Sequence, residues 1–290
     1  MKVVKYIANI QFMVGTVYKS TGSWYWVKSE TDSDSSALHK CRIKGKFRME
    51  GIKSTNPIAV GDQVDFTVET IGDEELGIIT KIHERTNYIV RKSVNLSKQT
   101  HIIASNIDQV FLLVTINNPL TLTTFIDRFL VTAEAYSIKA ILIFNKIDTY
   151  AMEERAEILC FRDIYKAIGY ECVEVSSTEH TNIERVKELM KGKVSMFSGH
   201  SGVGKTTLVN AIEPTLNLKT KEISKQHKQG QHTTTFAEMF ALSFDAKIID
   251  TPGIKGFGVV DMSKEELGDY FPEFFALKSA CKFNKLYPCK

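Results

Sequence analysis

The chain has 290 residues, 43% of them hydrophobic and 24% charged, and its formal net charge is +3 at pH 7. This composition is ordinary for a soluble globular protein of one large or two smaller domains. The net charge is too small to identify a nucleic-acid-binding protein by itself. No apolar run approaches the roughly 18 residues of a membrane helix, and the scattered cysteines favour reduced thiols in the cytoplasm. The cysteines lie at positions 41, 160, 172, 281 and 289.

Short runs with strand-like alternation occupy the N-terminal part of the chain. They lie at 14–19, 23–28, 38–49, 63–68 and 77–82. Five short strands with turn residues between them predict a small β-barrel over residues 1–85. Asn9 and Gln11 interrupt the apolar start, so no signal peptide is predicted, and the residues before Met13 are interpreted as a dispensable extension.

The third of these strands carries a cation at every second position. The five cations are Lys40, Arg42, Lys44, Lys46 and Arg48. Period two places them on one side of the sheet, and because like charges in a row repel, the arrangement favours a phosphate backbone as ligand. Trp24 and Trp26, on the neighbouring strand, supply rings that can stack on bases. The alternative is a solvated edge strand that its lysines protect from pairing.

Residues 86–106 are polar and basic, and we interpret them as a connector between two domains. Four cations in or beside this segment are candidates for extending the basic track: Arg85, Arg91, Lys92 and Lys98.

The pattern changes after the connector, where continuous apolar runs alternate with segments of helical spacing. The strand-like runs lie at 110–116, 140–144, 171–175 and 193–197, and the helical segments at 123–136 and 153–168. This alternation predicts an α/β domain over residues 107–260, with a mostly parallel sheet and helices on both faces. Residues 261–290 begin with a capping-box signal and predict a short helical extension that is interrupted at Pro272.

A guanine-specificity signature follows the second apolar run of this domain. Residues 145–148 read NKID and fit NKxD, at the carboxyl end of a predicted parallel strand, where ligands bind. Asp148 is the candidate base reader, because a carboxylate accepts the N1 and N2 hydrogens of guanine. Asn145 and Lys146 are expected to brace the loop. Ser176 and Ser177 end the next strand and match the fifth GTPase motif, a weak signal on its own.

A phosphate-binding loop comes later in the chain. Residues 199–206 read GHSGVGKT and fit G-x-x-x-x-G-K-[ST] between a strand and a helix. Its glycines let backbone N–H groups turn toward an anion, and the helix N-terminus adds partial positive charge. Lys205 is expected to bridge the β- and γ-phosphates and Thr206 to bind Mg²⁺. The candidate nucleotide-binding residues here are Gly199, His200, Ser201, Gly202, Val203, Gly204, Lys205, Thr206 and Thr207.

Two further GTPase elements follow the phosphate loop. The run GQHTTT at 230–235 lies where switch I belongs, and Thr234 is favoured as a Mg²⁺ ligand, with Thr233 the alternative. His232 is a candidate for orienting water, against the alternative of a solvent-exposed loop histidine.

The last element is DTPG at 250–253, which fits DxxG. Asp250 is expected to hold Mg²⁺ through water and Gly253 to sense the γ-phosphate. Ile254 stands where Ras-like proteins have a glutamine, and an aliphatic side chain cannot orient water. Hydrolysis by the protein alone is therefore expected to be slow.

NKxD precedes the phosphate loop here, whereas an ordinary GTPase has the reverse order. With its GQHTTT switch and its GTVYKSTGSWYWV start, the chain resembles the RsgA family of circularly permuted GTPases, which act in small ribosomal subunit biogenesis. The resemblance implies a multidomain α/β protein: an N-terminal OB-type β-barrel, a circularly permuted P-loop GTPase domain and a C-terminal zinc-binding extension. It also implies GTP/GDP and Mg²⁺ as ligands, the small subunit and its rRNA as partners, and participation of His232 in hydrolysis.

One departure from the family concerns zinc. The family tail has the form Cys-x₄-Cys-x-His-x₅-Cys, whereas here Cys281 and Cys289 are the candidate ligands and no histidine follows Cys281. Two thiolates do not complete a four-ligand structural site. Either the tail is shortened in this sequence or the protein lacks zinc.

The expected function is that of a cytoplasmic, monomeric GTPase without a membrane partner. It binds rRNA through the barrel and cycles by subunit-stimulated hydrolysis late in small-subunit maturation. The alternative is a nucleotide-dependent RNA-binding module whose hydrolysis is incidental, and Ile254 is compatible with that.

Overall fold

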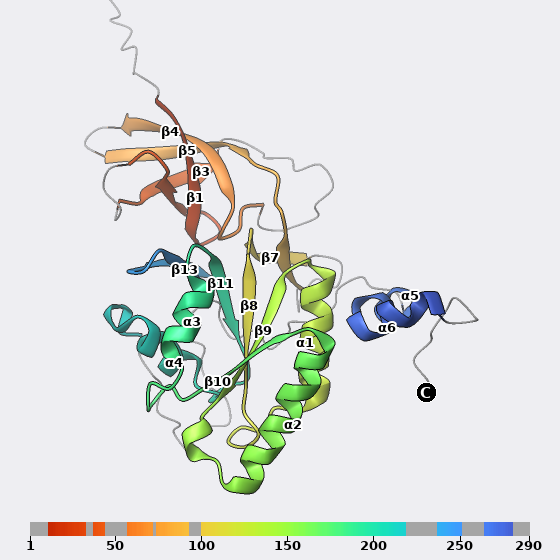
Figure 1. Ribbon diagram of the computed structural model, residues 1–290. Coiled ribbons are helices and arrows are strands. Elements are labelled where there is room, and N and C mark those ends of the chain that lie inside the picture. Colours follow the sequence, from red (N-terminus) through yellow and green to blue (C-terminus); the bar gives the residue numbers. More distant parts are fainter. Residues whose placement is uncertain are drawn as a thin grey trace, which may run out of the picture. The chain divides into compact units, whose positions relative to one another are not determined.

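The computed structural model describes residues 11–32, 37–43, 57–71, 74–92, 100–218, 237–250 and 264–280 (Figure 1). The chain divides into two compact units. The first comprises Met1–Asn106 with Phe236–Met239, and the second comprises Ile107–Thr235 with Phe240–Lys290.

A five-stranded barrel forms most of the first unit. Its strands are β1 (Gln11–Ser20), β2 (Tyr25–Ser29), β3 (His39–Ile43), β4 (Gln63–Ile71) and β5 (Glu74–Ile82). They follow the order β1-β2-β3-β5-β4, and pairing of β4 with β1 closes the barrel. Only β3 and β5 run parallel among these pairs. The predicted OB-type barrel is therefore confirmed, although residues 44–49 of its third predicted strand lie outside the described residues.

Inward-facing side chains from every strand fill the barrel. Val17, Val27, Cys41, Phe66 and Ile79 have no exposed surface. The core leaves no room beside Cys41, because a Cβ on Gly77 of the paired strand would lie 2.2 Å from the Cys41 sulfur. Along β2 buried residues alternate with partly buried ones, and along β3 exposed residues flank the buried Cys41. This period of two is the physical basis on which the barrel could be predicted.

The segment predicted as a connector contains a strand pair. β6 (Tyr88–Lys92) and β7 (Thr100–Ser105) form a two-stranded antiparallel ribbon. Ile89, Ile102 and Ala104 are buried. The two strands are short and their apolar residues are few, so the polar composition of the segment hid the pairing.

A buried ion pair joins the start of this ribbon to the barrel within the first unit. The Arg85 guanidinium donates to both carboxylate oxygens of Asp62 at 2.6 Å. The two side chains are 5% and 0% exposed. Ser105 Oγ donates to the same carboxylate at 2.6 Å, and the Ala59 N–H does so at 2.9 Å. Arg85 is therefore not part of an exposed basic track, and that interpretation was wrong.

The second unit contains a mostly parallel sheet. Its strands are β8 (Gln109–Val114), β9 (Lys139–Asn145), β10 (Glu171–Val175), β11 (Val194–Ser198), β12 (Glu238–Leu242) and β13 (Ala246–Asp250), with the unit boundary falling within β12. The order is β10-β9-β8-β11-β13-β12, and the four pairs from β10 to β13 are parallel. β8 is buried along its whole length, as its continuous apolar run predicted.

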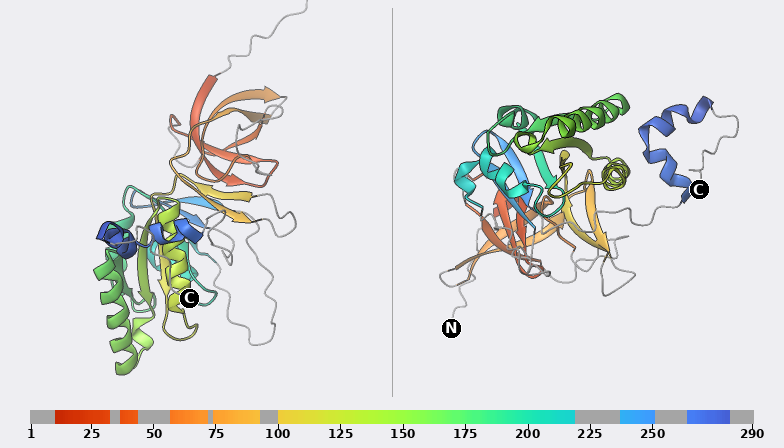
Figure 2. Two further views of the ribbon diagram at one scale, coloured as in Figure 1. Left: turned by 90° about the vertical axis from the view of Figure 1, so that its right-hand side faces the viewer. Right: turned by 90° about the horizontal axis from the view of Figure 1, so that it is seen from below.

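Helices cover both faces of this sheet, as predicted. They are α1 (Thr123–Ala135), α2 (Met152–Ile168), α3 (Ile183–Met190) and α4 (Lys205–Ile212). α3 and α4 lie on one side, where side chains such as Val186 and Leu208 pack against Phe111 and Ile141, while α1 and α2 lie on the other (Figure 1). α1 and α2 lie side by side (Figure 2), and Tyr165 Oη donates to Asp127 Oδ1 between them at 2.7 Å.

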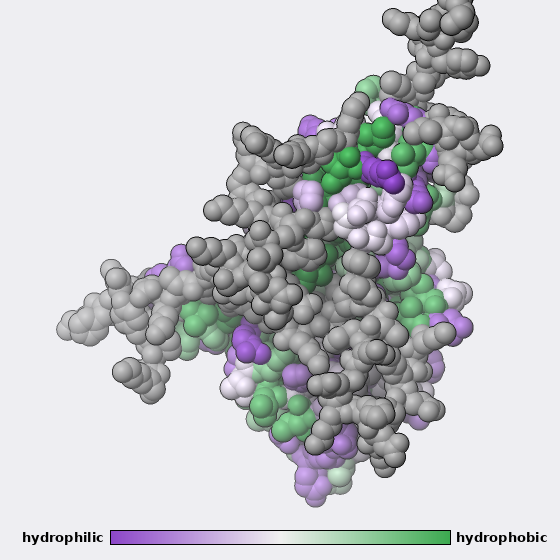
Figure 3. All heavy atoms as spheres, turned by 180° about the vertical axis from the view of Figure 1, so that it is seen from behind, coloured by the Kyte–Doolittle hydropathy of each residue, from purple (hydrophilic) through white to green (hydrophobic). Residues whose placement is uncertain are grey.

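The described part of the C-terminal extension contains two short helices, α5 (Lys264–Leu267) and α6 (Pro272–Leu277), each followed by a 3₁₀ turn, at Gly268–Tyr270 and Lys278–Ala280. Pro272 interrupts the helical path as expected, and it begins the second helix because its missing N–H costs nothing at a first turn. Of the described helices, none has the length and apolarity to cross a bilayer. On the face in Figure 3, hydrophobic residues of the described surface lie among hydrophilic ones.

Candidate nucleotide-binding site

The loop between β11 and α4 has a backbone that only glycine adopts without strain. Gly199, Gly202 and Gly204 have φ angles of 143°, 85° and 99°. A Cβ on Gly199 would lie 2.8 Å from the carbonyl oxygen of Leu113 on the adjacent strand β8. Ser201 and Gly202 are exposed at the tip of the loop, whereas Val203 is buried beneath it. The loop thus has the shape that the phosphate-binding motif predicts.

The Lys205 side chain folds back across this loop. Its ammonium donates to the carbonyl oxygens of Gly199 at 2.6 Å and His200 at 2.9 Å. Burial lowers the pKa of Lys205, and the nearby negative charge of Asp250, which ends β13, opposes that shift. The Lys205 ammonium, at the start of α4, and the Asp250 carboxylate, at the end of β13, therefore attract each other. Thr206 and Thr207, in the first turn of α4, are partly exposed.

Asn145 connects the predicted base-reading loop to the phosphate loop. It ends β9, and only 1% of its surface is exposed. Its Nδ2 donates to the carbonyl oxygen of Val203 at 2.9 Å, and its Oδ1 accepts from Ser177 Oγ at 2.9 Å. One side chain therefore links three segments that the sequence places between positions 145 and 203.

The phosphate loop in turn leaves space for Asn145. Gly204 caps α4 in a left-handed conformation, and a Cβ at this position would lie 2.4 Å from Asn145 Nδ2. Glycine at 204 thus allows both the backbone turn and the approach of the amide.

The Asp148 carboxylate is held by hydroxyl groups from the loop after β10. Ser176 Oγ donates to Oδ1 at 2.5 Å and Thr178 Oγ1 donates to Oδ2 at 3.1 Å. The Ser176 hydroxyl is the main cause that lowers the pKa of Asp148, so the carboxylate is ionised at neutral pH. Lys146, in a left-handed conformation with φ 66°, donates from Nζ to the carbonyl oxygen of Asn118 at 2.6 Å. Burial lowers the pKa of Lys146.

Several residues of this region carried no sequence signal of their own. Thr178 was missed because it stands after the serine pair, and Asn118 because its contribution is a backbone carbonyl. Phe125 of α1 packs on His200 with ring centroids 4.1 Å apart. Burial, together with the charges of Lys205 and Arg128, lowers the pKa of His200, which favours a neutral imidazole beside the phosphate loop.

Part of the predicted set lies outside the described residues. These residues are His232, Thr233, Thr234, Gly253, Ile254, Cys281 and Cys289. Within the described ranges, no group of three or more His, Cys, Asp or Glu side chains is arranged to hold a metal ion.

The described part of the basic strand lies on the barrel surface. Lys40 and Arg42 are exposed, with the buried Cys41 between them. Both cations stack on Trp24, with Lys40 Nζ 4.3 Å and Arg42 Cζ 3.8 Å from the ring centroid. Lys44, Lys46 and Arg48 are outside the described residues.

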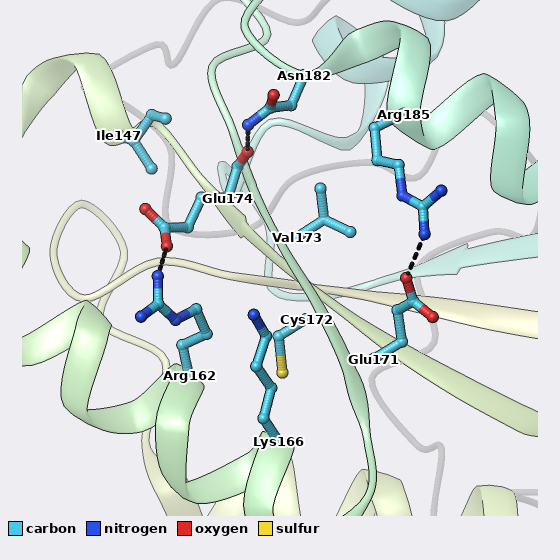
Figure 4. Close-up of a pocket in the computed structure, with 9 residues that line it drawn as sticks. All are labelled: Ile147, Arg162, Lys166, Glu171, Cys172, Val173, Glu174, Asn182 and Arg185. Carbon is cyan, nitrogen blue, oxygen red and sulfur yellow. Dashed lines mark hydrogen bonds and ion pairs between the residues drawn. The ribbon is translucent and has the colours of Figure 1, made fainter.

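A groove of about 490 Å³ lies over strand β10, between α2 and α3 (Figure 4). Its two arginines are paired: Arg162 contacts Glu174 at 2.6 Å and Arg185 contacts Glu171 at 2.9 Å. Apart from Ile147, its lining contains none of the predicted nucleotide-binding segments. This groove is thus separate from the phosphate loop.

Comparisons with known proteins agree with this arrangement. A family model described as RsgA GTPase matches residues 82–260, and one described as RsgA N-terminal domain matches residues 14–79. Proteins named small ribosomal subunit biogenesis GTPase RsgA from Christiangramia forsetii and Bacteroides fragilis (strain YCH46) are 68% and 51% identical over 272 residues. Each alignment covers 94% of this chain, and 85% and 86% of the respective relatives.

Solved structures share the fold. The crystal structure of YjeQ from Thermotoga maritima has a TM-score of 0.72 at 32% identity, covering 91% of this chain and 83% of that one. YloQ, described as a circularly permuted GTPase, has a TM-score of 0.70 at 27% identity, covering 100% and 87%. The chain therefore belongs to the RsgA family of circularly permuted GTPases.

Proposed function

We propose that this GTPase acts in late maturation of the small ribosomal subunit, where it binds the subunit in its GTP form and leaves after hydrolysis. The observation that carries the proposal is the Asn145 side chain, which ties the NKID loop to both the phosphate loop and the serine pair. Such coupling suits a ligand with a guanine at one end and phosphates at the other. The names of the relatives supply the ribosomal context.

Each part of the nucleotide has a proposed partner. The Asp148 carboxylate accepts N–H groups of guanine, and the backbone beside Ser176 and Ser177 reads its carbonyl oxygen. Backbone N–H groups of residues 199–207 and the Lys205 ammonium bind the phosphates, helped by the N-terminus of α4. On this proposal, the Lys205 ammonium gives up its hydrogen bonds to the carbonyl oxygens of Gly199 and His200 and donates to phosphate oxygens when the nucleotide binds.

Magnesium fits the chemistry of the side chains beside the phosphate loop. Thr206 is partly exposed, and Asp250, at the end of β13, lies close enough for its charge to act on Lys205. Oxygen ligands of this kind suit Mg²⁺, which neutralises charge on the β- and γ-phosphates when bound. Thr234 is proposed as a further ligand and Gly253 as the γ-phosphate sensor, both on sequence grounds. No zinc site is proposed.

Subunit-stimulated hydrolysis is the test of the proposal. GTP turnover should be slow for the protein alone and rise strongly when purified small ribosomal subunits are added, because Ile254 cannot orient water. His232→Ala should remove most of that stimulation while leaving GDP affinity unchanged, and Lys187→Ala on the surface of α3 serves as a neutral control. Equal subunit affinity of the GTP and GDP forms would contradict the release step, since a ligand without differential affinity shifts nothing.

The barrel is the proposed rRNA-binding unit. Lys40 and Arg42 present exposed charge, and both lie over Trp24, so that ring is covered and is not free for a base on that face. Lys28 similarly lies over Tyr18, 5.4 Å from its centroid. The surface therefore favours contact with phosphates over stacking with bases, which modifies the expectation for the aromatic residues.

Removing the two described cations should weaken binding to the subunit and flatten its salt dependence. For Lys40→Ala with Arg42→Ala, we expect the slope of log affinity against log salt to fall by about 2, because each cation is expected to neutralise one phosphate. Binding of the GTP-loaded protein to subunits across a salt series measures this slope. Lys187→Ala is the control. An unchanged slope would mean that the two cations are solvated charges on the barrel surface without a phosphate partner, since β3 is paired on both sides and is not an edge strand.

The remaining parts of the proposal are a cytoplasmic location and a monomeric protein. Membership in a GTPase family favours this enzyme over the alternative of an RNA-binding module with incidental hydrolysis.

A further inference from the structure

Tyr150 stands two residues after Asp148 and contacts the ends of two adjacent strands. Its hydroxyl donates to the carbonyl oxygen of Asn145 at 2.9 Å, at the end of β9. The Tyr150 hydroxyl oxygen in turn accepts from the N–H of Ile116, just beyond β8, at 3.4 Å. Only 6% of the tyrosine surface is exposed. The hydroxyl thus fixes the backbone where the NKID loop leaves the sheet.

The carbonyl that Tyr150 binds belongs to the residue that links the loops. Because both ends of the Asn145 amide are already bonded, a shift of its backbone would disturb the contacts with Val203 and Ser177. The same shift would move Asp148, three residues further along. The Asp148 carboxylate has to accept from two donors on the base at once, so guanine recognition depends on the position of the carboxylate as well as on its charge.

The chemistry of the phenol suits a permanent donor. Burial raises the pKa of Tyr150 to about 12, so the hydroxyl keeps its proton throughout the physiological range. Lys146 adds a second tie between the same loops through the carbonyl of Asn118. Of the two side chains, Tyr150 is buried and Lys146 is partly exposed, so water competes less with the hydrogen bonds of Tyr150.

We propose that the Tyr150 hydroxyl is a positioning group for guanine recognition, which holds the backbone from Asn145 to Asp148 so that the Asp148 carboxylate meets the base edge. This inference rests on the proposed nucleotide site and adds a specificity-determining residue outside the NKxD motif.

Tyr165 provides a matched control in the same unit. It is also buried, at 4% exposure, and its hydroxyl also donates one hydrogen bond, to Asp127 Oδ1. That bond joins α1 to α2 and touches no residue of the NKID loop. Tyr165→Phe therefore reports the general cost of losing a buried tyrosine hydroxyl.

The test compares Tyr150→Phe and Tyr165→Phe in the full chain, by titration with GDP and with IDP. IDP lacks the exocyclic amine of guanine, so the ratio of the two affinities reports how well Asp148 meets the base edge. Tyr150→Phe should weaken GDP binding by about 3- to 10-fold, the usual effect of one net hydrogen bond, and lower the GDP-to-IDP ratio. Tyr165→Phe should leave both quantities at the values of the unmodified protein.

Three outcomes would count against the inference. An equal loss of GDP and IDP affinity in Tyr150→Phe would mean that the hydroxyl only supports the fold. Unchanged GDP affinity would mean that it does not position the loop at all. If the unmodified protein binds GDP no better than IDP and ADP, the proposed guanine site itself fails, and the inference fails with it; that case is recognised before any variant is measured.

Discussion

Gly204→Ala should weaken GDP and GTP binding by up to about 100-fold, the size of effect that a displacement on the order of 1 Å can have in a preorganised site. The added Cβ would lie 2.4 Å from Asn145 Nδ2, so the amide has to move away. That movement breaks its bond to Val203 and disturbs its bond with Ser177, which removes the side-chain link between the NKID loop and the phosphate loop. Titration with a fluorescent GDP analogue measures the loss.

Gly169→Ala separates this effect from simple backbone strain. Gly169 caps α2 in a left-handed conformation with φ 118°, comparable to the 99° of Gly204, but a Cβ there meets nothing within 4 Å. Both variants should therefore lose about 1 kcal/mol of stability from the left-handed alanine. Only Gly204→Ala should lose affinity. Similar affinity for the two variants would mean that the Asn145 amide can move away from the added Cβ without weakening nucleotide binding.

Most of the sheet and the backbone shape of the phosphate loop could be predicted from the sequence, because both have local signatures. The continuous apolar run that became β8, and the glycines at 199, 202 and 204, each express a physical requirement that is visible in a few consecutive residues. The two short helices α3 and α6 and the ribbon of β6 and β7 were not predicted. Length alone is not the reason, because the five-residue strands β10 and β11 were predicted. The ribbon lies in a polar, basic segment, and that composition hid its pairing.

Long-range side-chain contacts were not predictable from the chain. NKxD marks Asn145 and Asp148, but nothing in it indicates that Tyr150 would bind the Asn145 carbonyl or that Thr178 would bind Asp148. The error over Arg85 has the same origin. A cation in a basic, polar segment was assigned to the surface, whereas its partner Asp62 is 23 residues away and fully buried.

Asp62→Asn should lower the stability of the first unit by about 3–5 kcal/mol, the usual cost of leaving one partner of a buried ion pair without its counter-charge. Arg85 would stay buried with a neutral amide in place of a carboxylate that also binds Ser105 and Ala59. Its Nη1 already has no hydrogen-bond partner in the described part of the chain, so the guanidinium depends on Asp62 and the Pro57 carbonyl.

The two tryptophans make this unit separately measurable, because Trp24 and Trp26 are the only ones in the chain and both lie in the barrel unit. Tryptophan fluorescence during urea unfolding should shift its midpoint in Asp62→Asn, whereas GDP binding reports the second unit.

The double variant Asp62→Asn with Arg85→Met tests the assignment to the ion pair. Once the aspartate is gone, removing the buried charge should recover part of the lost stability, so the double variant should be more stable than Asp62→Asn alone. Lys187→Ala, which removes an exposed ion pair with Glu184, should cost no more than about 1 kcal/mol. Arg85→Met measured alone completes the comparison. If its loss of stability and that of Asp62→Asn simply add in the double variant, Asp62 stabilises the barrel through its bonds to Ser105 and Ala59, and the pairing with Arg85 contributes little.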